Sequence, residues 1–186
     1  QTSEGIFYGR TVVLATGAGP KKLGLPGEES LTGRGVAYCA SCDGMFYKGK
    51  TVAVIGGGNS AVSDALLLSR IAARVILIHR RSSLRADKIY HKAMQDAPNI
   101  EFRWNSRVTS LLQEGSRLAG LGLQDVNSGE ESILACDGAF ISIGRQPQTE
   151  LAAGRLSMDE NGYIIADETT ATSIPGVYAA GDVRTK

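Results

Sequence analysis

The chain has 186 residues, of which 42% are apolar and 21% charged, and its formal net charge is +1. This length fits one domain or slightly more, and the composition predicts a folded globular chain with a buried core. The near-neutral charge excludes attraction to nucleic acid or to a membrane surface through overall charge alone. Polar residues interrupt the longest apolar stretch, 65–78, so we expect no membrane-spanning helix.

The cysteine content and the N-terminal residues indicate the cellular compartment of the protein. Three cysteines are too few for a disulfide framework, and two of them, Cys39 and Cys42, are separated by only two residues. This spacing is more typical of redox or metal chemistry than of structural crosslinks. The sequence begins at Gln1 and shows no signal peptide. We therefore expect a soluble, cytoplasmic protein whose sequence is cut from a longer one.

The elements predicted from the first half of the chain alternate between strands and helices. An apolar, β-branched run at 11–15 predicts a strand that ends in a turn. The stretch 21–35 is rich in glycine and proline and predicts a connector. A strand at 51–55, a helix at 59–72 and a strand at 74–79 then form one βαβ unit with parallel strands.

The second half of the chain predicts a change of architecture. A helix is expected at about 86–97 and a strand at 100–104. Short apolar runs separated by glycines predict antiparallel hairpins from 107 to 143, and a last short strand leads into Gly181-Asp182. The expected fold is α/β: a Rossmann-like three-layer nucleotide-binding domain with an antiparallel hairpin layer.

A glycine-rich turn links the 51–55 strand to the following helix. In this Gly-x-Gly-x-x-Ala pattern, Gly56 permits a tight turn, Gly58 lets backbone approach a pyrophosphate, and Ala61 lets the helix pack closely. The N–H groups of Asn59 and Ser60, at the helix start, would face the phosphates. The alternative is a turn without a ligand.

A basic cluster follows the second strand of the βαβ unit, where an acidic residue would accept a hydrogen bond from the ribose of NAD. The chain has instead His79, Arg80, Arg81 and Arg85. Guanidinium groups match phosphate oxygens, so the cluster favours the 2′-phosphate of NADP, with NADPH as the reduced form. The alternative is a solvated basic surface.

The pair Cys39 and Cys42, expected at a helix start, can form and break a disulfide, since a helix N-terminus stabilises a thiolate. The neighbouring Asp43 could pass a proton to the leaving thiolate. The remaining candidate ligands, Cys136, His79 and His91, are not paired at the spacing of a structural zinc site, so we expect no metal site. Two cysteines without redox function are the other alternative. A nicotinamide transfers its electrons as hydride, and a disulfide normally receives them through a flavin, so the chemistry implies one.

Four motifs occur along the chain: Cys39-Ala-Ser-Cys42-Asp43-Gly44, Val54-Ile-Gly-Gly-Gly-Asn-Ser-Ala61, His79-Arg-Arg-x-x-x-Arg85 and Thr172-Ser-Ile-Pro-Gly-Val-Tyr-Ala-Ala-Gly-Asp-Val183. Together they resemble bacterial thioredoxin reductases of the low-molecular-weight type over nearly the whole chain. The resemblance implies an NADPH-binding domain with the redox cysteines at 21–148, and fragments of an FAD domain at 1–20 and 149–186. It also implies electron transfer from NADPH through FAD and the cysteines to thioredoxin, in a full-length homodimer.

The resemblance also implies individual roles. Thr16, Gly17, Gly181 and Asp182 match the turns that contact FAD. Cys42 would face the flavin and Cys39 would react with the protein substrate. Hinges would lie near 21–26 and after Gly144.

Two parts of the resembling family's pattern do not occur: the N-terminal Gly-x-Gly-x-x-Gly that binds FAD, and the segment after Gly-Asp that packs against the isoalloxazine ring. We therefore expect that this chain alone does not hold FAD. Two alternatives follow. The protein could be a flavoprotein reductase partner of a peroxiredoxin, or the chain could be an NADP-binding module without turnover.

Overall fold

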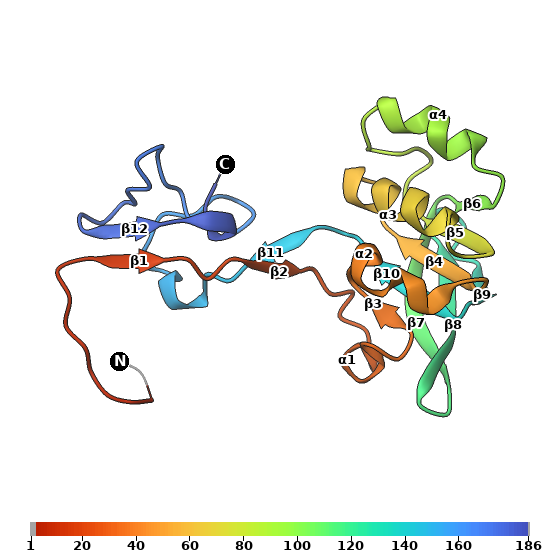
Figure 1. Ribbon diagram of the computed structural model, residues 1–186, viewed down its shortest axis with the longest axis horizontal. Helices are drawn as coiled ribbons and strands as arrows, with labels where there is room; N and C mark the ends of the chain where they lie inside the picture. The colour runs from red at the N-terminus through yellow and green to blue at the C-terminus, as the bar shows by residue number, and fades with distance from the viewer. Residues whose placement is uncertain (1–2, 186) are drawn as a thin grey trace. The chain divides into compact units, whose positions relative to one another are not determined.

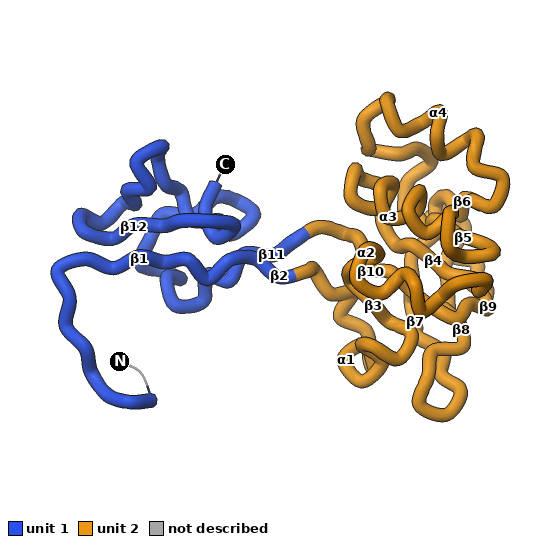
Figure 2. The backbone as a smooth tube through the Cα atoms, in the orientation of Figure 1, with its two compact units in different colours: residues 1–19, 145–186 blue, residues 20–144 orange. Residues whose placement is uncertain are grey.

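The computed structural model describes residues 3–185 and divides the chain into two compact units (Figures 1 and 2). Unit 1 combines the two ends of the chain, Gln1–Gly19 and Arg145–Lys186, and unit 2 is the continuous segment Pro20–Gly144 between them. The chain therefore passes between the units twice, next to Gly19 and next to Gly144.

Unit 2 is built on a five-stranded sheet in the order β3-β10-β4-β5-β6, with parallel pairing throughout. Its strands are β3 (Val36–Ala37), β4 (Thr51–Ile55), β5 (Arg74–Ile78), β6 (Ile100–Arg103) and β10 (Gly138–Ile141). The helices are α1 (Glu28–Leu31), α2 (Ala40–Asp43), the 3₁₀ helix η1 (Gly44–Tyr47), α3 (Asn59–Ser69) and α4 (Ile89–Asp96).

Both faces of this sheet are covered. Along β4, Val52 and Val54 belong to a buried cluster with the apolar side of α3, while Ala53 and Ile55 belong to a second cluster. The second cluster packs against an antiparallel sheet of β7 (Ser106–Glu114), β8 (Arg117–Asp125) and β9 (Glu131–Ala135). Alternate side chains of a strand point to opposite faces, so β4 contributes to two cores. Helices, parallel sheet and antiparallel sheet form the three expected layers, and the predicted α/β fold is confirmed (Figure 1).

The expected elements differ from the observed ones in three places. Helix α3 ends at Ser69, and 70–72 form a tighter turn in which the Arg70 N–H bonds the Leu67 carbonyl. Helix α4 begins at Ile89, later than expected, because the preceding residues bond to the glycine turn. The prediction of hairpins up to 143 was wrong at its end, since β10 lies between β3 and β4 as a parallel strand.

Unit 1 has much less regular structure. Strands β1 (Val12–Leu14) and β12 (Val177–Ala179) pair in parallel, and β2 (Ala18–Pro20) pairs with β11 (Arg145–Pro147) where the chain passes between the units. Two 3₁₀ helices follow β11 and β12, η2 (Glu150–Ala152) and η3 (Gly181–Val183). Its core is small and contains Ala152, Ile164, Ala166, Ala179 and Val183.

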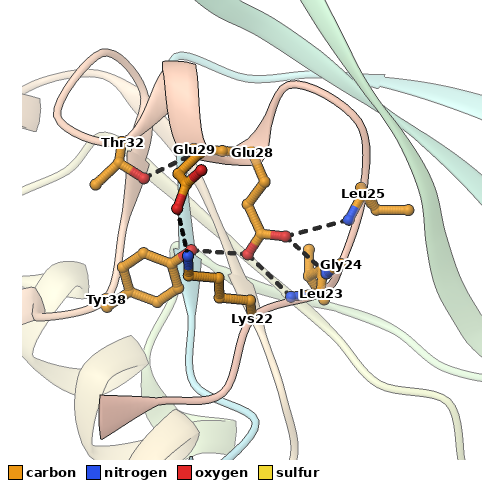
Figure 3. A network of polar contacts seen from close by, with 8 residues as sticks. All are labelled: Lys22, Leu23, Gly24, Leu25, Glu28, Glu29, Thr32 and Tyr38. Carbon is orange, nitrogen blue, oxygen red and sulfur yellow. Dashed lines mark hydrogen bonds and ion pairs between the residues drawn. The ribbon is translucent and has the colours of Figure 1, made fainter.

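A buried carboxylate, Glu28, organises the first segment of unit 2 (Figure 3). Its oxygens accept hydrogen bonds from the N–H groups of Leu23, Gly24 and Leu25, at 2.9, 2.7 and 3.2 Å, and from the Tyr38 hydroxyl at 2.7 Å. The stretch that the sequence presents as a connector is thus fixed to unit 2 from residue 23 onward.

Candidate active site

A pocket of about 540 Å³ lies in unit 2 at the carboxyl ends of β4, β5 and β10. This edge of a parallel sheet is where ligands bind in doubly wound α/β folds. The glycine turn, the end of β5, the start of β7 and the residues after β10 form its walls. The lining residues are Lys21, Leu23, Ile55, Gly56, Gly57, Gly58, Asn59, Ser60, Ile78, His79, Arg80, Arg85, Ser106, Arg107, Val108, Ser142, Ile143 and Gly144.

The glycine turn has the geometry that a close ligand approach requires. Gly56 has a φ of +147°, and a Cβ there would lie 2.8 Å from the Ala61 Cβ and overlap the Ser142 carbonyl oxygen. A side chain at Gly57 would overlap the buried His79 ring. At Gly58 the nearest atom to an added Cβ is Arg85 Nη2 at 4.0 Å, so this position is open. Ala61 is buried beneath the turn and does not line the pocket.

The basic segment after β5 folds back over this turn. The N–H groups of Arg85 and Ala86 both donate to the Gly57 carbonyl oxygen, at 2.7 and 3.1 Å. Asn59 at the start of α3 makes two hydrogen bonds with Asp87: its Nδ2 donates to Asp87 Oδ2 at 2.8 Å, and its Oδ1 accepts from the Asp87 N–H at 2.9 Å. These bonds bring Arg85, almost thirty residues away in sequence from the turn, into the same pocket wall.

The pocket is electropositive. Four permanently basic side chains line it, those of Lys21, Arg80, Arg85 and Arg107, and its lining residues include no Asp or Glu. Arg81, from the same segment, does not line it. Guanidinium groups and backbone N–H groups at the start of α3 fit a phosphorylated ligand.

His79 lines the pocket, and its polar side chain is buried. Its Nε2 is buried and has no hydrogen-bond partner among residues 3–185. Burial lowers the pKa of His79, and the charges of Arg85, Arg81 and Arg80 lower it further. The imidazole is therefore neutral at physiological pH, and it supports Gly57 and the basic segment without adding charge.

The two cysteines of the Cys-x-x-Cys pair form a disulfide, with Cys39 as the N-cap of α2 as expected. Cys39 Sγ accepts a hydrogen bond from the Cys42 N–H at 3.2 Å and lies 3.3 Å from the Ser41 hydroxyl. Donors directed at a sulfur stabilise its thiolate. The side chain of Asp43 is half-buried and lines an adjacent cavity, and the structure shows no hydrogen bond from it to either sulfur within the described chain.

The surface beside the disulfide combines exposed apolar side chains with charged ones of both signs. Met45 and Phe46 follow Asp43 and are 66% and 75% exposed. The adjacent cavity of about 360 Å³ is lined by Phe46 together with three basic residues and two acidic ones, Arg34, Lys50, Arg117, Asp43 and Asp137. Large exposed apolar side chains beside a reactive group are typical of a protein-binding surface.

The third cysteine is chemically separate from this pair. Cys136 is buried, and this burial, together with the charge of Asp137, raises the pKa of its thiol to about 12. The thiol is thus protonated and unreactive at neutral pH. In residues 3–185 no group of three or more His, Cys, Asp and Glu side chains could hold a metal ion.

The expected flavin-contacting residues lie in unit 1 on two adjacent turns. Thr16-Gly17 follows β1 and Gly181-Asp182 follows β12, and since these strands are parallel neighbours, both turns lie at the same edge. Gly17 and Gly181 have φ values of +72° and +76° with open space at their Cβ positions. Asp182 lines a pocket with Asp159, Tyr163 and Arg184.

Sequence patterns missed the part of the unit 2 pocket that is formed by Lys21, the start of β7 and the residues after β10. Lys21, Ser106, Arg107, Val108, Ser142 and Ile143 line it in addition to the expected residues. Ser106 and Arg107 reach it because the Ser106 N–H donates to the His79 carbonyl at 3.0 Å. Such a contact between distant strands leaves no local signal in the sequence.

Among the described helices, none is long and apolar enough to cross a membrane.

Comparison with known proteins agrees with this geometry. The pattern of the pyridine nucleotide-disulphide oxidoreductase family matches residues 3–186. A thioredoxin reductase of Streptomyces clavuligerus is 47% identical over 96% of this chain and 55% of its own length. The F subunit of an alkyl hydroperoxide reductase of Pseudomonas putida is 44% identical over 95% of this chain and 34% of its own length.

A solved structure supports the same relationship. Thioredoxin reductase of Lactococcus lactis superposes with a TM-score of 0.87 at 40% identity, covering 95% of this chain and 58% of that one. The chain thus spans about 55% of the length of the thioredoxin reductase that it resembles in sequence. With a matching family pattern, a glycine turn at the sheet edge and a Cys-x-x-Cys disulfide, the chain belongs to the pyridine nucleotide-disulphide oxidoreductase family.

Proposed function

We propose that this chain is part of an NADPH-dependent flavin disulfide reductase that reduces thioredoxin or a similar small redox protein. The observation that carries the proposal is that unit 2 alone contains both a cation-lined pocket on a glycine turn and the Cys39–Cys42 disulfide. Similarity to thioredoxin reductases supports the choice of protein substrate.

The pocket residues favour NADPH over NADH. Gly58, Asn59 and Ser60 would bind the pyrophosphate through backbone N–H groups, and Arg80 and Arg85 would bind the 2′-phosphate. A carboxylate in this position would repel that phosphate, and the pocket lining contains none. His79, buried against Gly57, would hold the turn in place.

We assign the flavin site to unit 1, as part of an FAD domain formed by 1–20 and 149–186, with 21–148 as the NADPH domain. Thr16, Gly17, Gly181 and Asp182 lie at one open edge of the β1–β12 pair, which fits a nucleotide cofactor. When bound, NADPH would supply hydride and FAD would relay the electron pair to the disulfide.

From the resemblance to thioredoxin reductases we also propose that the whole protein is a homodimer in the cytoplasm.

The cysteines would exchange electrons with the substrate by thiol–disulfide exchange. The Cys39 thiolate attacks the substrate disulfide, which forms a mixed disulfide and releases one substrate thiolate. The Cys42 thiolate then attacks Cys39 Sγ, which restores the Cys39–Cys42 disulfide and releases the second substrate thiolate. The substrate gains the two electrons that the dithiol loses. Asp43 would supply a proton to a leaving thiolate at this site.

Trapping of the mixed disulfide tests the thiol chemistry without any cofactor. In the Cys42→Ser variant, Cys39 remains as a lone thiol, and we expect it to couple to a thioredoxin whose cysteine carries a thionitrobenzoate group. The Cys39→Ser variant is the matched control and should couple much more slowly, because its remaining Cys42 lacks the donors that Cys39 Sγ receives. Cys136 does not interfere, since its thiol is buried. Equal coupling by both variants would contradict the assignment of Cys39.

A second candidate function is the reduction of a peroxiredoxin-type protein, which the similarity to the F subunit of an alkyl hydroperoxide reductase favours. The same trapping experiment separates the two candidates when thioredoxin and the disulfide-bearing domain of a peroxiredoxin system compete for the Cys42→Ser variant. Thioredoxin should form the major adduct under the first proposal. If the chain binds NADPH but neither adduct forms, it is an NADP-binding module without turnover.

A further inference from the structure

Arg107 is a basic residue of the pocket to which no sequence motif points. It lies on β7, the first strand of the antiparallel sheet, and its side chain is exposed at the pocket wall. We propose that Arg107, held in place by Gln124, binds the 2′-phosphate at the adenosine end of the dinucleotide and contributes to selection of NADPH over NADH. This inference rests on the proposed NADPH site and adds a specificity-determining residue to it.

The backbone places Arg107 beside the basic segment that follows β5. The N–H of Ser106 donates to the His79 carbonyl at 3.0 Å, and the N–H of Asn105 donates to the Arg81 carbonyl at 3.2 Å. The start of β7 is therefore joined to the residues that carry Arg80. In a fold of this type the ribose of the adenosine half lies at the end of the second strand of the βαβ unit, which is β5 here. Arg107 therefore lies at the end of the pocket where the ribose of the adenosine half and its 2′-phosphate would bind.

The side chain of Arg107 is oriented by a cross-strand partner. Arg107 and Gln124 are opposite each other in the β7–β8 register. Arg107 Nε and Nη2 both donate to Gln124 Oε1, at 2.9 and 2.5 Å, and Gln124 Nε2 donates to the Gly129 carbonyl at 3.3 Å. A guanidinium held through one edge loses little further conformational freedom when its other donors bind a ligand.

The positive charge of Arg107 is not neutralised by an acidic side chain of the described residues. A guanidinium carries five N–H donors, and the structure uses two of them, both on a neutral amide oxygen. No carboxylate pairs with Arg107 within residues 3–185. A carboxylate partner would also join the two strands, but it would neutralise the guanidinium. The neutral Gln124 amide orients the guanidinium and leaves its full positive charge available to a phosphate.

Binding titrations of the 186-residue chain test this inference. Wild type, Arg107→Ala, Gln124→Ala and Arg70→Ala are each titrated with NADPH, NADH and adenosine 2′,5′-bisphosphate. Arg70 is the matched control, because it is an exposed arginine of unit 2 at the opposite end of α3 from the glycine turn. Its removal changes net charge equally without touching the pocket.

We expect Arg107→Ala to weaken NADPH and the bisphosphate about tenfold, equivalent to about 1.4 kcal/mol, and to change NADH affinity less than about twofold. Gln124→Ala should weaken the same two ligands by a smaller factor, because it removes the anchor and leaves the charge. Arg70→Ala should bind all three ligands as wild type does. A thermal melt followed by Trp104 fluorescence checks that each variant is folded.

The failures are distinguishable. If wild type prefers NADPH and Arg107→Ala retains that preference in full, Arg107 does not read the phosphate although the proposed NADPH site stands. Equal weakening of NADPH and NADH by Arg107→Ala would make Arg107 a structural residue of the hairpin and also overturn the inference. If wild type binds neither dinucleotide, the proposed site itself fails and the inference fails with it.

Discussion

The two units of this chain differ in how far they bury their own apolar side chains. In unit 2, two clusters cover both faces of the parallel sheet, and residues such as Val52 and Leu77 are fully buried. Unit 1 has one small cluster and leaves Phe7, Tyr8 and Val13 exposed by 70%, 94% and 62%. Because buried apolar area is the main driving force of folding, unit 2 is expected to be the stable part, and its pocket and disulfide are built entirely within that part.

The largest effect should come from truncation of the unit 2 core. Leu77 on β5 is fully buried in the cluster on the helix side of the sheet. Leu77→Ala removes buried methyl groups and leaves a cavity, at an expected cost of about 2–5 kcal/mol in the free energy of unfolding. Denaturant unfolding followed by the fluorescence of Trp104, the chain's one tryptophan and a unit 2 residue, measures this loss.

A parallel truncation in unit 1 sharpens the comparison. Ile164 is fully buried in the small unit 1 cluster, so Ile164→Ala should destabilise unit 1 by a similar mechanism. If the units unfold separately, the Trp104 transition should be unchanged in this variant. A shift of that transition as large as in Leu77→Ala would show that the stability of unit 2 depends on unit 1.

Glu28 should give the next largest effect. Its burial alone would raise the pKa of its carboxyl, but hydrogen bonds from Tyr38, Leu23, Leu25 and Gly24 outweigh burial and hold the pKa below its usual value of 4.5. The stabilisation is therefore present above about pH 4.5 and is lost as pH falls through the lower folded-state pKa. Glu28→Gln should cost about 1–3 kcal/mol at pH 7, since a buried donor loses its charged acceptor.

The pH dependence of unfolding provides the control for this variant. The difference in unfolding free energy between wild type and Glu28→Gln should shrink as pH is lowered from 7 to 3, because the wild-type carboxyl then becomes neutral as well. Glu29→Gln is the matched surface substitution, as Glu29 pairs with Lys22 in the open, and it should leave stability close to that of wild type because solvent screens an exposed ion pair. If the difference in unfolding free energy between wild type and Glu28→Gln did not change with pH, the charge of Glu28 would not be what holds residues 23–25 in place.

The smallest effect is expected behind the pocket wall, at Asp64, which does not line the pocket but bonds to the lining residue Ser142. Asp64 on α3 is half-buried and accepts a hydrogen bond from the Ser142 hydroxyl at 2.5 Å. Burial raises the pKa of Asp64, so the folded state binds its proton more tightly than the unfolded state, and stability falls as pH rises through this pKa. Asp64→Asn retains an acceptor for Ser142 and should be equal to wild type or more stable by less than about 1 kcal/mol at pH 7, measured by denaturant unfolding. Destabilisation at pH 7 would show that the charge itself is required.

Sequence patterns predicted those parts of unit 2 whose signals are local. Strands β4 and β5 are runs of β-branched and aliphatic residues, and the turn between β4 and α3 has glycines at the spacing that a dinucleotide turn needs. The glycine turn and the basic segment were both expected, but not the bonds between Gly57 and Arg85 that join them. These bonds also delay the start of α4, which amphipathic periodicity alone cannot reveal.

Features set by long-range pairing were not predictable in the same way. Strand β10 has a short apolar sequence that fits a hairpin as well as a central parallel strand, and its place was decided by partners β3 and β4 far away in the chain. Arg107 reaches the pocket only because β7 is joined to the end of β5. Arg81 belongs to the basic motif but lies outside the pocket wall, since sequence proximity does not fix side-chain direction.

The most direct test of the central claim, that unit 2 carries the whole NADPH site, is amide hydrogen exchange of the chain with and without saturating NADPH. We predict slower exchange at 56–60, 79–86 and 105–108, with no change in unit 1. Protection confined to unit 1, or no protection anywhere under conditions that saturate known NADPH enzymes, would contradict the claim.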